Sequence, residues 1–320
     1  MKLRSLLILA VTLLLIYLAL RQVGVDELLE TVRQADPLYV VLAISMSPLL
    51  ILVSVIKWHT LVKTQHDEVP FSYLFKLYIA GYFFTNFLPT SVGGDVVRVY
   101  ELGSRTKDPA GAMASVFMER VSGFLVLMVV ASAAFLGNLT LINNGVIALV
   151  MLGVALAFLG MVWMIVDARL LNFIESRLNL SLVRKYTAKV RKFRASLYAY
   201  KGQRRVLASV FGWSVVYNLV MILNVYVCAS AFDKSVSLAT ISVAAPILAL
   251  ISIVPLTFNG AGIQEWGYVL LFTAFGMPAS VGLSTILLIR AKTIFFIVIP
   301  GGLIYPSLRL RPNEVAMSAR

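Results

Sequence analysis

A break inside an apolar segment is the feature that most limits the folds open to this sequence. The apolar residues 71–88 are followed by helix-breaking residues and then by two charges: Pro89, Gly93, Gly94, Asp95 and Arg98. Proline lacks a backbone donor, and glycine permits backbone angles that other residues avoid. Interrupted backbone is tolerated at membrane depth only where protein or a watery cavity covers it. The pattern therefore predicts a segment that enters a bilayer, breaks and returns.

The composition is that of a membrane protein. Hydrophobic residues make up 60% of the chain and charged residues only 13%, whereas soluble domains are about one-quarter charged. We expect an all-α polytopic protein in which residues 1–320 form a single integral membrane domain. The single cysteine, Cys228, excludes a disulfide framework. The two histidines, His59 and His66, lack metal-ligand spacing, so we expect no metal and no cofactor.

The net charge of +13 is concentrated in one segment. Residues 167–205 carry eleven basic and two acidic residues. A basic loop between spans is typical of the cytoplasmic side, where it also attracts anionic lipid headgroups. This distribution favours a membrane surface over nucleic acid. Counting spans from this loop predicts a multi-pass protein of the cell (inner or plasma) membrane with both termini in the cytoplasm.

Six apolar stretches are predicted as full spans: residues 6–20, 38–56, 110–136, 146–166, 206–231 and 279–304. We interpret the first as an anchored helix rather than a signal peptide. Lys57 then falls in a cytoplasmic loop, 57–70. Since residues 90–109 also count as cytoplasmic, residues 71–88 connect inside to inside, as a re-entrant hairpin does.

A second break follows late in the chain and contains the same kinds of residue: Pro255, Gly260, Gly262 and Glu265. The flanking segments 239–256 and 263–275 connect outside to outside. They fit a second re-entrant hairpin or two further spans, which would give eight full spans.

The spacing around the two breaks favours two hairpins in an inverted repeat. Pro89 and Pro109 are 20 residues apart, and Pro255 and Pro278 are 23 apart. An arginine then follows each second proline after 11 or 12 residues. The predicted halves are residues 38–136 and 206–304, joined by the span 146–166 and the basic loop 167–205. In transporters built this way, broken helices meet near the midplane and bind the cargo.

Several ionisable residues fall at membrane depth. Arg120 lies roughly 16 Å into its helix, near the middle of a ~30 Å hydrocarbon core, and a charge there costs at least ~2.5–3.5 kcal/mol. We predict a polar pathway for a headgroup, formed by both halves and lined by Asp95, Arg98, Glu119, Arg120, Glu265, Arg290 and Lys292. The alternative is that these residues pair with one another and only stabilise the helix bundle.

The sequence resembles the lysylphosphatidylglycerol synthase transmembrane-region family, also called the flippase-like domain family. The resemblance rests on Leu88-Pro89 through Gly93-Gly94-Asp95 to Arg98, on Glu119-Arg120 with Gly123, and on Pro255 through Gly260, Gly262 and Glu265. The resemblance implies either the membrane half of a synthase, which moves aminoacylated lipid between leaflets, or a stand-alone protein tied to hopanoid or lipid-linked sugar pathways. Because the chain ends at residue 320, we expect a stand-alone member without the aminoacyl-transferase domain.

The resulting hypothesis is a non-enzymatic, flippase-like protein that moves a polar, aminoacylated or phospholipid headgroup between leaflets. Its expected partners are a phospholipid or lipid-linked substrate, the membrane, and a cytosolic or membrane synthase docked on the basic loop. Nucleic acid is not expected. One alternative is an accessory protein in a lipid-linked sugar or hopanoid pathway. Another is a membrane glycosyltransferase, for which Asp26 and Glu27 would be the acidic pair.

Overall fold

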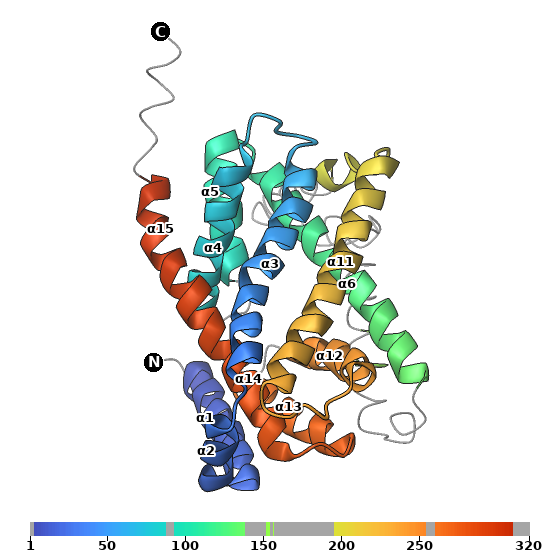
Figure 1. The fold of residues 1–320 in the computed structure, drawn as a ribbon. Coiled ribbons are helices and arrows are strands. Elements are labelled where there is room, and N and C mark those ends of the chain that lie inside the picture. The colour runs from blue at the N-terminus through green and yellow to red at the C-terminus, as the bar shows by residue number, and fades with distance from the viewer. Residues whose placement is uncertain are drawn as a thin grey trace.

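The computed structural model describes residues 3–87, 93–137, 152–153, 156, 195–253 and 260–309, and every regular element in these ranges is a helix (Figure 1). Four helices there are long and apolar enough to cross a membrane: Pro37–Val62, Pro109–Ala133, Arg204–Ser230 and Ala279–Leu308. They correspond to four of the six predicted spans. The chain is therefore a multi-pass helical membrane protein.

Other predicted features fall wholly or largely outside the described residues. Pro89 and Pro255 lie there, as do most of the span 146–166 and of the basic loop. The first predicted span corresponds to α1 (Leu3–Val23), which is followed by the short amphipathic helix α2 (Val25–Arg33). Hence the number of spans, and the choice between six and eight, stay predictions.

Helix α3 (Pro37–Val62) is longer than its predicted span. Asp36 caps its first turn by accepting a hydrogen bond from the backbone N–H of Leu38 at 2.9 Å, as capping residues do. The helix then continues through Lys57 to Val62, so Lys57 belongs to the span and not to a loop as predicted. Helix α11 (Arg204–Ser230) packs along α3.

The first hairpin consists of α4 (Phe71–Phe87) and α5 (Gly93–Thr106), which pack against each other in the upper half of Figure 1. With 17 and 14 residues, they extend about 26 and 21 Å, which is less than a ~30 Å hydrocarbon core. Helix α6 (Pro109–Leu136) follows. Asp108 caps it by accepting a hydrogen bond from Gly111 N at 3.0 Å.

The second hairpin consists of α12 (Leu238–Ile253) and α13 (Ile263–Ala274), and it lies in the lower half of Figure 1. Helix α14 (Ala279–Thr293) then rises through the bundle and continues as the π-helical turn η2 (Ile294–Val298) and α15 (Ile299–Arg309). Pro300 explains the wider turn, since proline has no N–H and its ring clashes with the carbonyl one turn earlier.

The two largest apolar clusters among the described residues each surround one hairpin. The first joins α3, α4, α5 and α6 through residues such as Val55, Leu74, Leu102 and Val116. The second joins α1, α6, α11, α12, α13 and α14 and is centred on α12 and α13. Each hairpin therefore has its own core.

Candidate functional site

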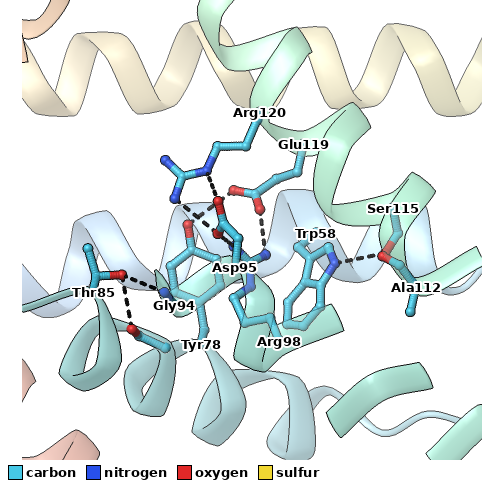
Figure 2. Close-up of polar contacts among 11 residues, drawn as sticks. Trp58, Tyr78, Thr85, Gly94, Asp95, Arg98, Ala112, Ser115, Glu119 and Arg120 are labelled. Atoms are coloured by element: carbon cyan, nitrogen blue, oxygen red, sulfur yellow. Dashed lines mark hydrogen bonds and ion pairs between the residues drawn. The ribbon is translucent and has the colours of Figure 1, made fainter. Parts of the chain in front are cut away.

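A close contact between α4 and α5 positions the charged residues of the first hairpin. A Cβ atom on Gly94 would lie only 2.2 Å from the carbonyl oxygen of Gly81. The N–H of Gly94 donates to Thr85 Oγ1 at 3.1 Å, and that hydroxyl donates to Gly81 O at 3.1 Å (Figure 2). Gly94 is thus required for close approach and not for a positive φ.

Asp95, one residue further along α5, accepts hydrogen bonds from two arginines. Arg120 of α6 donates through Nε at 2.9 Å to Oδ2 and through Nη2 at 3.0 Å to Oδ1. Arg98 donates to Oδ1 at 3.1 Å. A fork of two parallel bonds is the strongest geometry for a guanidinium–carboxylate pair.

Arg98 is fully enclosed. Its guanidinium lies 4.0 Å from the ring centre of Trp58 and 4.2 Å from that of Tyr78. It also donates to Glu119 Oε2, while the Tyr78 hydroxyl donates to Glu119 Oε1 at 3.0 Å (Figure 2). Stacking on aromatic faces stabilises a desolvated arginine. Trp58 and Tyr78 therefore belong to the site, a role that the sequence analysis missed.

Arg120 differs from its neighbours because most of its side chain is exposed. It exposes 59% of its side chain, whereas the paired Asp95 exposes 11%. In Figure 2 two of its guanidinium nitrogens face Asp95 and the third points away. This arginine is the twelfth residue of α6, about half-way along a helix of membrane length.

Lys57 is a third residue whose place in the site the sequence analysis missed. It exposes only 4% of its surface. Its Nζ lies 5.7 Å from the ring centre of Tyr217, and a Cβ on Gly123 would come within 3.0 Å of it. The available signal was its position directly after a predicted span and before Trp58, but a lysine at the end of an apolar run was interpreted as a loop residue.

The second hairpin carries a similar pair. Gly262 has φ +85°, which favours glycine, and its N–H donates to Glu265 Oε2 at 2.6 Å. Arg290 of α14 donates to Glu265 through Nε and through Nη2 at 3.3 Å, and to Gln264 Oε1 at 3.0 Å. Gly260 likewise has a positive φ of +70°.

Lys292 lies close to Arg290 in the sequence but belongs to a different contact. It is buried, and its Nζ donates to the carbonyl oxygen of Ala43 at 2.6 Å and to Asn224 Oδ1. Among the described residues no hydrogen bond or ion pair joins it to Glu265. In the same part of the chain none joins the two hairpins' charged clusters either, so the structure forms two separate sites.

The two sites repeat one arrangement. Arg120 and Asp95 are 25 residues apart, as are Arg290 and Glu265. In both, the carboxylate lies in the first turn of the second hairpin helix, and the arginine lies on the long helix that follows. The predicted inverted halves stay a prediction.

Membrane-length helices around two short hairpins, each with a buried carboxylate that is paired with an arginine, define a polytopic helical membrane protein with ionisable groups inside its bundle. The chain belongs to the lysylphosphatidylglycerol synthase TM region family, whose model matches residues 5–301. The resemblance noted from the motifs is therefore confirmed.

Archaeal membrane proteins are similar to the chain over most of its length. A UPF0104 membrane protein of Methanocaldococcus jannaschii is 24% identical, over 90% of this chain and 90% of its own length. One from Pyrococcus horikoshii is 24% identical over 95% and 96%. A third, from Methanothermobacter thermautotrophicus, is 23% identical over 81% and 82%.

Proposed function

We propose that the protein moves lipids between leaflets without chemical turnover, with the polar headgroup passing along the charged sites while the acyl chains stay in the lipid. Both hairpins are then re-entrant, one from each face of the membrane. In this proposal the end of the bundle where α5 ends and α11 begins, the upper end in Figure 1, faces the cytoplasm. The chain next to these two helix ends carries Arg105, Lys107 and Lys201.

The exposure of Arg120 carries this proposal. A charge at the centre of a span costs at least ~2.5–3.5 kcal/mol if it meets hydrocarbon, so exposed mid-span charges face water or a polar ligand. A purely structural role accounts for Arg98, because that guanidinium is buried between two rings and two carboxylates. It does not account for Arg120, whose side chain is 59% exposed.

The test is lipid movement in vesicles that contain the purified full chain. Fluorescent phospholipid in the inner leaflet is protected from an external quencher until it crosses, so the rate of loss of fluorescence measures movement. Arg120→Ala should lower this rate about 10- to 100-fold, since a charge-assisted hydrogen bond is worth ~1.5–3 kcal/mol and 1.4 kcal/mol is tenfold.

Arg105→Ala is the matched control, because Arg105 is an exposed arginine in the last turn of α5, where its side chain lies 4.4 Å from the ring centre of Tyr73. It should leave the rate within about twofold of the unmodified protein. Movement no faster than in protein-free vesicles would refute the proposed function. Equal rates for Arg120→Ala and the unmodified protein would remove Arg120 from the pathway.

A further inference from the structure

The charged cluster of the first hairpin has one more cation than it has carboxylates. Lys57, Arg98 and Arg120 face Asp95 and Glu119, and Lys57 lies within electrostatic range of Glu119 and both arginines. All four carboxylate oxygens already accept hydrogen bonds, from Arg98, Arg120 and Tyr78. With each group in its ordinary ionised form, the cluster carries a net charge of +1.

Lys57 is the cation left without an acceptor. It is buried, yet within the described part of the chain its ammonium makes no hydrogen bond or ion pair, and the ring centre of Tyr217 lies 5.7 Å from its Nζ. A buried charge without a partner is strongly unfavourable. Gly123 leaves the space beside Lys57 Nζ free of a side chain.

Arg120 supplies a second set of free donors beside it. Its bonds to Asp95 use Nε and Nη2 only, and the third nitrogen points away from that carboxylate (Figure 2). Gly123, whose Cβ position lies 3.0 Å from Lys57 Nζ, follows Arg120 by three residues on α6, so the two positions share one face of that helix. An ammonium and a guanidinium together suit an anion with several acceptor oxygens, such as a phosphate group, better than a single-atom anion.

We propose that Lys57 and Arg120, between α3, α6 and α11, form a binding site for a singly charged phosphodiester. The source of that group, a lipid headgroup, rests on the proposed function, whereas the anion site rests on the unpaired ammonium. The second hairpin has no equivalent site among its described residues, because Lys292 there is already bound to Ala43 O and Asn224.

The experiment measures ligand-dependent thermal stabilisation of the full chain in a neutral detergent. Its probes are short-chain phosphatidylglycerol, the matching diacylglycerol without phosphate, and inorganic phosphate. A ligand that binds only the folded state raises the Tm in proportion to its affinity. Phosphatidylglycerol should give a saturable rise, and Lys57→Met should weaken that binding at least ~10-fold, the value of one charge-assisted contact.

Lys63→Met is the matched control, since Lys63 follows the same helix but is exposed and paired with Asp67. It should bind like the unmodified protein. Without ligand, Lys57→Met should have a Tm equal to or above that of the unmodified protein, because it removes an unpaired buried charge. Lys57→Gln provides the same test if the methionine variant does not fold.

The outcomes separate the site from the function. A Lys57-dependent rise with inorganic phosphate as large as with phosphatidylglycerol would support the anion site and identify a free anion as its ligand. Binding that is unchanged in both Lys57 variants, or equal for diacylglycerol, would overturn the site. Lys57-dependent binding without lipid movement in vesicles would leave the site standing and refute only the proposed function.

Discussion

Replacing Gly94 by alanine tests whether the contact between α4 and α5 holds Asp95 in place. The new Cβ would lie 2.2 Å from Gly81 O, 2.3 Å from Thr85 Oγ1 and 2.7 Å from Gly81 C. The hydroxyl can rotate away, but the backbone of α4 cannot. The distance between the new Cβ and the Gly81 backbone must therefore increase beyond 3.0 Å, because real Cβ atoms essentially never make shorter contacts.

The loss of stability can be estimated from the contacts that are broken when α4 and α5 move apart. Overpacking a tight contact costs about 1–3 kcal/mol. The Gly94 N–H also loses its acceptor on Thr85, which adds about 1 kcal/mol. Asp95 moves with Gly94, so its forked contact with Arg120 is strained as well. We expect a loss of about 2–4 kcal/mol and a Tm lower by several degrees.

The assay is thermal unfolding in detergent, followed by tryptophan fluorescence, with Gly212→Ala as the control. Gly212 lies inside α11, and a Cβ there would meet nothing within 4 Å. Alanine is the better helix former, so this variant should be as stable as the unmodified protein or slightly more stable. If Gly94→Ala and Gly212→Ala have the same Tm, the contact does not position the site.

Two further results are expected. The Lys234 ammonium donates to Asp36 at 2.7 Å and holds the pKa of that carboxyl below its ordinary value of 3.8. The pair therefore stabilises the fold above pH 3.8, and this contribution is lost as the pH falls through the lowered pKa. Between pH 6 and pH 3, Asp36→Asn should lose less Tm than the unmodified protein, and identical pH profiles would contradict this. Glu265→Gln should lower the stability by about 3 kcal/mol, because Arg290 loses its charged partner. The double variant with Arg290→Met should recover part of that loss, and no recovery would show that the damage is not electrostatic.

The long helices and their starts could be predicted from the sequence because their causes are local. Hydropathy gave the four described spans, and Asp108-Pro109 marked the start of α6 through a cap and a proline in the first turn. The pairing of Asp95 with Arg120 could also have been predicted, since the sequence analysis assigned both residues to one site at membrane depth. Asp26 and Glu27 lie in the first turn of α2, after Gly24 at the N-cap.

The burial of Lys57 could not be predicted, because it depends on neighbours that are distant in the sequence. Hydropathy ends the span at Ile56, where polar residues begin. In the folded chain α6 and α11 enclose the last turns of α3, so Lys57 lies against Gly123 and Tyr217. The role of Trp58 has the same origin. Its ring is part of the apolar core, but it also stacks on Arg98 and donates to Ser115 at 3.1 Å.

The difference between the two sites comes from a helix that is not repeated. Both carboxylate–arginine pairs have the same spacing of 25 residues, so the hairpin and the helix after it suffice to form the pair. Their exposure differs, since Arg290 exposes 22% of its side chain and Arg120 exposes 59%. Helix α1 packs against α13 beside the second pair, where a Cβ on Gly262 would lie 2.8 Å from Thr12 O. The repeated unit therefore supplies a carboxylate–arginine pair in each hairpin, and the surroundings of the two pairs leave Arg120 more exposed than Arg290.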